Sequence, residues 1–278
     1  MTISSTVSVT QAAQSQAERL SALLSDVRQG IALRELWLYL GWRDVQKHYR
    51  RSVLGPLWLT LSMGITVGGL GFLYAQIFQM EISTYLPSLA LGFIVWGLIA
   101  GSLNGACMVF SNAAASIRQI RLPLSVHILQ FAWSQLIAFG HNFIIYLIVI
   151  VAFGLNPGWN AVLFIPALCL LTLNCVFVCM ILGPFCARFR DIPMIVASVT
   201  QVAFFMTPIL WSAEQLPERA HFVQLNPFYH FIEISRGPLL GQAVDPTNWV
   251  AAIGMTAAIG VVAILFFARF RARVAYWA

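Results

Sequence analysis

Six long apolar runs dominate the hydrophobic pattern of the chain, and polar or charged segments separate them. Each run is close to the roughly 20 residues that a helix needs to cross about 30 Å of hydrocarbon. We therefore predict an all-α integral membrane protein with six transmembrane helices, at Leu57–Phe78, Leu86–Phe110, Ser125–Phe153, Ala161–Ala187, Ile192–Trp211 and Trp249–Ala268.

The segments around these runs define the expected domain organisation. Residues 1–30 are polar and are predicted to form a cytoplasmic tail, which holds a short amphipathic helix. Residues 31–278 are predicted to form a single transmembrane domain. Within it we expect an interfacial helix at 31–56, spans 1–5 at 57–211, a re-entrant segment at 212–248, span 6 at 249–268 and a cytoplasmic tail at 269–278.

Composition and charge support this class and set the orientation. Only 9% of the residues are charged and 59% are hydrophobic, whereas a soluble domain carries about 25% charge. The net charge of +6 does not indicate nucleic-acid binding, because the basic residues flank the apolar runs. With both termini in the cytoplasm, every Lys and Arg except Arg219 and Arg236 lies inside, as the positive-inside rule requires.

A basic and aromatic stretch, WRDVQKHYRRSVLGPLW, joins the polar start of the chain to the first apolar run at residues 42–58. As a helix it places its cations on one face and rings on the other, a pattern typical of a helix lying in the membrane interface. The cations are Arg43, Lys47, Arg50 and Arg51, and Gly55–Pro56 ends the helix. An ordinary positive flank that orients the first span is the alternative.

Two short basic connections lie on the predicted cytoplasmic side. Residues 112–123 read NAAASIRQIRLP, and Ser111 or Asn112 is expected to cap a short helix that Pro123 ends. Arg188 to Asp191 form a second, tighter connection, in which Arg and Asp can pair locally. From the residues alone, a plain turn whose arginines orient the spans is preferred for the first connection, whereas for the second a plain loop and a contact with a partner protein are equally open.

The long outer connection, residues 212–248, is amphiphilic and is predicted to hold two short helices, broken at Pro217 and at Asn226–Pro227. Irregular backbone at membrane depth must be buried in protein or line a watery cavity. Glu233 and Arg236 are spaced i, i+3 and can pair on one helix.

Glycines recur at close spacing in two of the predicted spans. Gly97, Gly101 and Gly105 form one stripe, and Gly64, Gly68 and Gly69 form a weaker one. Small residues at such spacing let helices approach closely. We expect them to pack helices within one subunit, with a contact between subunits as the less favoured interpretation.

Motifs for enzymatic chemistry are missing from the sequence. It has no G-x-x-x-x-G-K-[ST] phosphate loop, no G-x-S-x-G elbow and no H-E-x-x-H pair. Since His127 and His141 are almost the only ionisable groups within the spans, an ion-coupled transporter is disfavoured. We expect no catalytic residue, no metal site and no cofactor on this chain. Scattered carboxylates and histidines in residues 212–248 leave a membrane-embedded glycan-modifying enzyme as an alternative.

Two groups of residues resemble the permease subunits of type-2 ABC exporters for polysaccharides, over about residues 31–241. The first group is Trp42, Arg43, Asp44, Tyr49, Arg50, Arg51, Ser52, Leu54, Gly55 and Trp58. The second group is Leu216, Pro217, Asn226, Pro227, Phe228, Tyr229, Ile232 and Arg236.

The resemblance implies a homodimer that works with two copies of a separate ABC ATPase, on which ATP and Mg are bound. Its expected cargo is a polyprenyl-pyrophosphate-linked polysaccharide, O-antigen first, moved from cytoplasm to periplasm across a bacterial inner membrane. Export of capsule or teichoic acid, or of a drug or lipid, is open within the same superfamily.

The resemblance also implies roles for particular residues. The ATPase-coupling residues are expected to be Ile117, Arg118, Arg121, Arg188 and Asp191. The residues expected to bind the lipid head group are Arg43, Arg50 and Arg51, because the planar guanidinium binds phosphate bidentately. The rings proposed to line a polysaccharide channel are Tyr74, Phe204, Phe205, Tyr229 and Phe231. The re-entrant element is expected to include Asn226, Pro227, Glu233 and Arg236.

Overall fold

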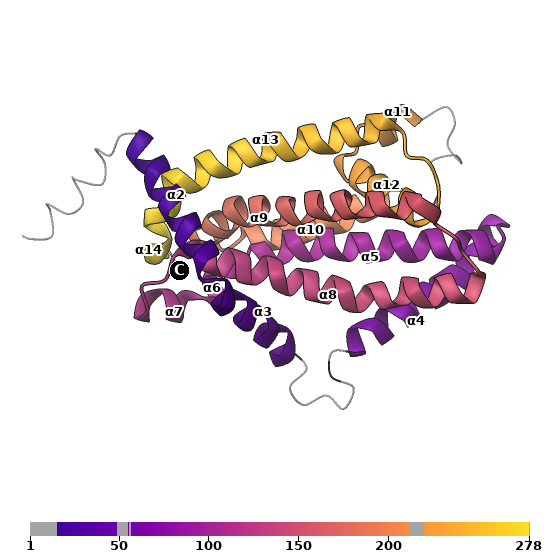
Figure 1. Cartoon of the computed structure of the whole chain (residues 1–278), viewed down its shortest axis with the longest axis horizontal. Helices are drawn as coiled ribbons and strands as arrows, with labels where there is room; N and C mark the ends of the chain where they lie inside the picture. The colour runs from indigo at the N-terminus through magenta and orange to yellow at the C-terminus, as the bar shows by residue number, and fades with distance from the viewer. Residues whose placement is uncertain (1–15, 49–54, 56, 212–219, 278) are drawn as a thin grey trace, which may run out of the picture.

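The computed structural model describes residues 16–48, 55, 57–211 and 220–277, and the regular elements of this part of the chain are all helical (Figure 1). Among the described residues, five helices are long and apolar enough to cross a membrane. They are α4 (Leu57–Phe78), α5 (Ile82–Ala106), α8 (Leu124–Phe153), α9 (Phe164–Arg188) and α13 (Pro246–Phe270). The predicted class, an all-α multi-pass membrane protein, is confirmed.

The predicted fifth span is shorter in the structure. Helix α10 (Ile192–Met206) has 15 residues, which rise about 22 Å at 1.5 Å per residue. The apolar run continues to Trp211, but residues 207–211 form turns rather than helix. The prediction of a helix to Trp211 was therefore wrong at its end, and a sixth membrane crossing stays a prediction.

The N-terminal segment forms two helices, α2 (Gln16–Ala32) and α3 (Arg34–His48), with a break at Leu33. The predicted interfacial helix from residue 31 thus begins three residues later, and the helix before it is longer than expected. Both helices pack against α8.

Two glycines allow this packing. A Cβ atom on Gly30 would overlap Ser125 Oγ, and a Cβ on Gly41 would lie 2.8 Å from the backbone oxygen of Gln130. Both distances are shorter than a Cβ contact permits, so α2 and α3 approach α8 as closely as they do because these positions carry no side chain.

Short helices lie at both ends of the bundle (Figure 1). The end that carries the C-terminus holds α6 (Val109–Asn112), α7 (Ala114–Gln119) and α14 (Val274–Trp277). The opposite end holds α11 (Ala220–Gln224) and α12 (Pro227–Leu239), and the 3-10 helix η1 (Gly158–Leu163) precedes α9. A second 3-10 helix, η4 (Arg271–Arg273), links α13 to α14.

The expected cap of the helix at residues 112–123 was wrong. Asn112 is still helical in α6, and Ala113 occupies the N-cap position of α7 without a side-chain hydrogen bond. Pro123 does not end α7, which stops at Gln119, but stands at the N-cap position of α8.

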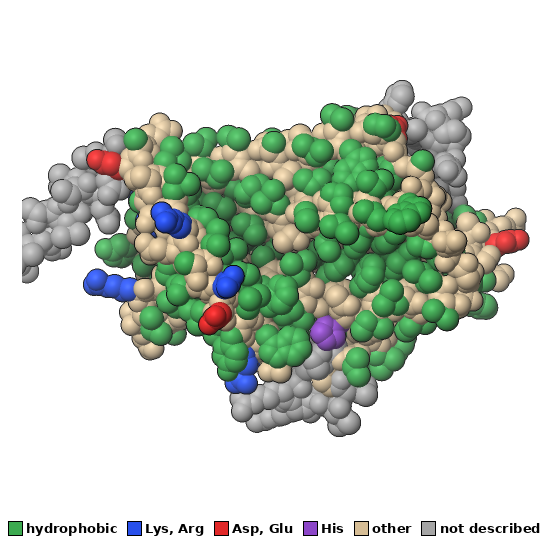
Figure 2. All heavy atoms as spheres, viewed as in Figure 1, with side chains coloured by type: hydrophobic (Ala, Val, Ile, Leu, Met, Phe, Trp, Pro, Cys, Tyr) green, Lys and Arg blue, Asp and Glu red, His purple; other side chains and the backbone are tan. Residues whose placement is uncertain are grey.

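Burial is uneven among the membrane helices. Of the 18 most apolar consecutive residues in each helix, 61% are buried in α5 and 11% in α4. Helix α5 is thus the centre of the bundle, and α4 lies on its outside. Figure 2 shows a largely hydrophobic surface over the middle of the molecule, with Lys and Arg side chains near the end that holds α2 and α7. Such a surface suits a protein surrounded by lipid.

Candidate functional site

The basic end of the bundle brings α7, the α9–α10 turn and α14 together. Helix α14 contacts both α7 and α9. The Arg188 guanidinium lies 5.9 Å from the ring centre of Phe189 and 5.8 Å from that of Trp277. Arginine is attracted to aromatic faces at such distances. Arg188 therefore packs beside the C-terminal helix.

The other predicted coupling residues lie on the same end. Arg118 and Arg121 are exposed on and just after α7. Ile117 is half-buried and packs against a hydrophobic cluster that contains Phe267 and Val274. Asp191 is exposed, and within the described residues it forms no ion pair with Arg188, so the local pairing considered for these two is not present.

Exposed arginines surround this end and give it a strong positive charge. They are Arg118, Arg121, Arg188, Arg190, Arg269 and Arg273. Together with α7 and α14 they make up what we call the basic platform. A positive surface of this kind attracts acidic partners over about one Debye length, near 8 Å at physiological ionic strength.

A buried carboxylate joins three distant segments beside the basic platform. The Asp26 side chain, 8% exposed, accepts hydrogen bonds from the backbone N–H groups of Leu124 (3.2 Å) and Ser125 (3.0 Å). It also pairs with Arg271 at 2.7 Å. Ser125 Oγ returns a hydrogen bond to the Asp26 carbonyl at 2.8 Å. Asp26 thus caps α8 from another helix, since its carboxylate takes the unpaired N–H groups of the first turn.

The sequence analysis missed Asp26. One signal was present, because Asp26 lies three residues after Leu23 on the face of the N-terminal helix that otherwise buries apolar side chains. An acidic residue on such a face needs a partner.

Helix α3, which was predicted to lie in the membrane interface, shows part of its predicted pattern. Arg43 and Lys47 are exposed, and Val45 is buried. Asp44 pairs with Lys47 at 3.1 Å and accepts a hydrogen bond from Gln130 Nε2 on α8. Trp42 is 44% exposed. Arg50 and Arg51, which were also predicted to bind a lipid head group, lie outside the described residues.

At the opposite end, α12 is bound to the turn that follows α10. Asn226 caps α12 by accepting from Phe228 N (2.9 Å), and its amide donates to Thr207 Oγ1 (2.9 Å). Arg236 pairs with Glu233, as predicted, and also donates to the Pro208 carbonyl at 3.1 Å. Both halves of α12 are therefore held to residues 207–208.

Helix α12 is also held to its other neighbours. The two ring nitrogens of the buried His230 lie 2.7 Å from Asn248 Oδ1 on α13 and 2.8 Å from the Gln224 carbonyl on α11. At the start of α13, a hydrogen bond from the backbone N–H of Thr247 holds the pKa of the exposed Asp245 carboxyl below its ordinary value. This end of the bundle is thus one hydrogen-bonded unit of α11, α12 and the ends of α10 and α13.

Comparison with protein families decides the relationship of this chain. The model of the family described as ABC-2 type transporter matches residues 35–240. The chain belongs to the ABC-2 type transporter family. The matched range runs from α3 to the end of α12.

Curated relatives of this ABC-2 type transporter are named for O-antigen export. The chain is 26% identical over 205 residues to an O-antigen export system permease protein of Myxococcus xanthus, which covers 72% of this chain and 78% of the relative. It is 26% identical over 196 residues to a protein of the same name from Klebsiella pneumoniae, covering 68% of this chain and 74% of the relative.

The residues matched to the ABC-2 type family include only part of the Asp26 contact. Asp26 precedes the matched residues and Arg271 follows them, while Leu124 and Ser125 lie inside. The carboxylate therefore joins the flanks of this chain to the part that it shares with its family.

The aromatic rings predicted to line a channel do not share one surface of this ABC-2 type chain. Phe231 is buried in the main core, and Phe204 packs 5.5 Å from Phe93 and 5.7 Å from Trp96 between ring centres. Phe205 is exposed. Tyr74, half-buried, stacks on Phe78, and Tyr229 lies beside His230. Their role in a channel stays a prediction.

Proposed function

We propose that this chain is the membrane-spanning subunit of an ATP-driven ABC exporter that moves a polyprenyl-pyrophosphate-linked polysaccharide, O-antigen above all, from the cytoplasm to the periplasm. The observation that carries the proposal is the family match, together with two relatives named as O-antigen export permeases. The membrane is then the bacterial inner membrane, which the chain crosses six times, with α10 and the following turn as the fifth crossing.

The basic platform is proposed as the docking surface for a separate ATPase subunit on the cytoplasmic side. Its exposed arginines, from three segments far apart in the sequence, offer a large positive surface beside the short helix α7. The chain itself contains no phosphate-loop motif, so ATP and Mg are assigned to the partner. Ile117, which packs into the bundle from α7, would transmit movement of the partner to the membrane helices.

A homodimer is proposed through α4 and α10. Helix α4 is the least buried of the five membrane helices, and a Cβ atom on Gly64, Gly68 or Gly69 would meet nothing within 4 Å. By contrast, a Cβ on Gly101 or Gly105 would strike α8 at Gln135 or Phe131. The stripe with Gly101 and Gly105 therefore packs helices within this subunit, and the stripe of Gly64, Gly68 and Gly69 is proposed to face another copy.

The lipid end of the cargo is assigned to α3. Arg43 is exposed there, and arginine binds a phosphate through two parallel N–H donors. Arg50 and Arg51, which follow in the sequence, are proposed to bind the same phosphate groups. The α11–α12 unit is proposed as the re-entrant periplasmic element.

A deletion strain for this chain tests the proposal through its surface glycan. Complementation with the unmodified chain should restore surface polymer, whereas Arg118→Glu combined with Arg121→Glu should fail and leave lipid-linked polymer inside the cell. The same double variant should lose co-purification with the ATPase subunit, because the charge of the docking surface is reversed.

The matched control is Arg118→Lys combined with Arg121→Lys, which keeps the charge at both positions and should restore display. A separate variant, Arg50→Ala combined with Arg51→Ala, tests the lipid role and should keep ATPase binding. Normal surface glycan in the deletion strain itself would refute the export function.

A further inference from the structure

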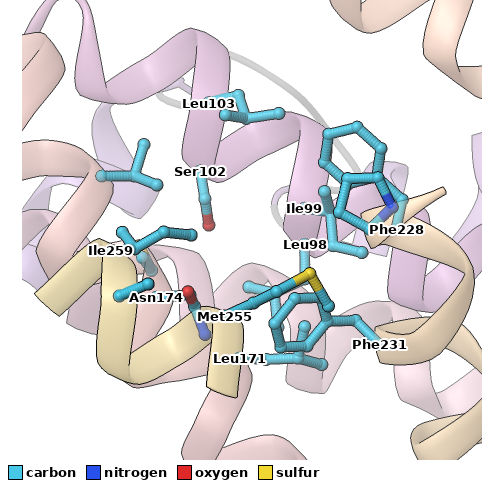
Figure 3. Close-up of a pocket in the computed structure, with 14 residues that line it drawn as sticks. Leu98, Ile99, Ser102, Leu103, Leu171, Asn174, Phe228, Phe231, Met255 and Ile259 are labelled. Carbon is cyan, nitrogen blue, oxygen red and sulfur yellow. The ribbon is translucent and has the colours of Figure 1, made fainter. Parts of the chain in front are cut away.

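A cavity of about 300 Å³ lies inside the bundle between α5, α9, α12 and α13 (Figure 3). Its walls are almost wholly apolar side chains, among them Leu98, Leu171, Phe231 and Met255. Two residues given roles above, Pro227 and Phe231, lie in its wall, but the space itself has been given no role. A cavity of this size is unusual, because the closely packed interior of a protein contains few voids larger than a water molecule.

One corner of the cavity is polar. Figure 3 shows the Ser102 and Asn174 side chains pointing their oxygen atoms toward one another across the space. The Asn174 amide nitrogen donates to Thr256 Oγ1 (2.7 Å) and to the Leu170 carbonyl (2.8 Å). Asn174 Oδ1 is buried and has no hydrogen-bond partner in the described part of the chain. A buried acceptor without a donor costs about 1–3 kcal/mol of stability, so this corner is suited to one donor, such as a water molecule.

The rest of the cavity is lined by apolar side chains and lies at membrane depth. An apolar space offers water few hydrogen-bond partners. Asn174 lies ten residues after the start of α9, which is about 15 Å along the helix axis and so near the middle of a 30 Å hydrocarbon layer. At this depth the surrounding medium supplies hydrocarbon chains and little else.

We propose that this cavity binds the hydrocarbon chain of a membrane lipid, with one water molecule donating to Asn174 Oδ1 at its polar corner. If a methylene group takes about the 30 Å³ of a water molecule, 300 Å³ holds on the order of ten such groups. That volume fits a stretch of an acyl chain or about two isoprene units.

The bound lipid chain would touch the unit formed by α11 and α12 directly. Phe228 and Phe231 on α12 form one wall of the cavity, and α5, α9 and α13 form the others. A lipid chain would therefore lie between α12 and the three membrane helices. The inference stands whether or not the protein exports a glycan.

Photolabelling of the purified full-length chain in lipid nanodiscs tests the proposal. Phosphatidylglycerol with a diazirine on its acyl chain and polyprenyl phosphate with a diazirine on its isoprenoid chain are used in separate samples, and labelled residues are mapped by mass spectrometry. We expect saturable labelling at Leu171–Val178 and Met255–Ile259 that unlabelled lipid displaces. The unlabelled lipid that displaces at the lower concentration identifies the source of the chain.

Two neighbouring alanines on α13 provide matched variants. Ala258 lines the cavity and Ala257 does not, and both are exposed. Ala258→Phe should reduce the saturable labelling about tenfold, equivalent to roughly 1.4 kcal/mol of binding free energy, while Ala257→Phe should leave it unchanged. Equal labelling of the two variants would overturn the proposal. So would labelling of the unmodified chain that rises linearly with lipid and resists competition, a result that does not depend on the folding of any variant.

Discussion

At the scale of single residues, Asp26 shows how a charge is accommodated beside an apolar bundle. A buried carboxylate loses its hydration, and this loss is offset only if the group is paired and hydrogen-bonded. Asp26 has two backbone N–H donors and one guanidinium. Each of these donors would lose its partner if the carboxylate were removed.

Asp26→Ala should therefore lower the free energy of unfolding by about 1.5–3 kcal/mol, the range for hydrogen bonds to charged groups. Asp26→Asn should cost less, because an amide oxygen can still accept from the N–H groups at the start of α8. Thermal unfolding of the purified protein in detergent, followed by circular dichroism, measures both. The control is Glu35→Ala, an exposed acidic position in the first turn of α3. An equal loss in the Asp26 and Glu35 variants would contradict the role given to Asp26.

Arg236 has a comparable role at the end of the bundle that holds α11 and α12. Its side chain is 11% exposed, and it joins Glu233 to the Pro208 carbonyl. Arg236→Ala leaves a partly buried carboxylate without its cation, so we expect a loss of roughly 1.5–3 kcal/mol. Arg236→Lys should recover only part of it, because an ammonium group lacks the two-armed donor geometry.

Protease sensitivity of residues 207–211 in membranes measures this change, since the turn should open when its contact with α12 is lost. Arg190→Ala, at an exposed position on the opposite end, is the control. Unchanged cleavage in Arg236→Ala would show that Asn226 alone holds the turn.

At the scale of elements, close approach decides how α3 lies on α8. Gly41→Ala places a methyl group within 2.8 Å of the Gln130 backbone oxygen and 2.9 Å of the Trp133 ring. Overpacking of this kind costs about 1–3 kcal/mol, and we expect the melting temperature to fall. Gly254→Ala on α13, away from the proposed contact between copies, is the matched control, because its added methyl group meets nothing within 4 Å and alanine favours helix. Similar melting temperatures for the two variants would show that α3 can shift on α8 without loss.

The apolar pattern predicted the membrane helices well, because about 20 consecutive apolar residues leave few alternatives. It failed at the end of α10, where residues 207–211 read TPILW and continue the apolar run. Contacts from Asn226 and Arg236, about 20 and 28 residues away, accompany the turn there, and no local pattern reveals them.

Local rules also failed at the caps. Ser111 and Asn112 are good capping residues, yet the chain stays helical through both. The donor groups at the start of α8 are satisfied instead by Asp26, 98 and 99 residues away. The pair Glu233–Arg236 was predictable because both residues lie within one turn of the same helix.

At the scale of the whole molecule, the exposed faces predict how two copies meet. Gly68→Cys, in a chain with the exposed Cys169 changed to serine, should form crosslinked dimers in membranes treated with a short bismaleimide. Val261→Cys on α13, where Val261 is 59% exposed, should stay monomeric, because α13 lies away from the proposed contact. Crosslinking through Val261→Cys and not through Gly68→Cys, read on a denaturing gel, would place the dimer contact on the other side of the bundle.

The pairing of Asp26 with Arg271 has a consequence for the order in which the protein is made. The two residues are 245 positions apart, so α2 leaves the ribosome long before its cationic partner is synthesised. Until then the Asp26 carboxylate has at most the N–H groups of Leu124 and Ser125 to satisfy it. The N-terminal helix should therefore reach its final, tightly held position only after the last membrane helix has been inserted. Its docking would then mark the completion of the newly made subunit.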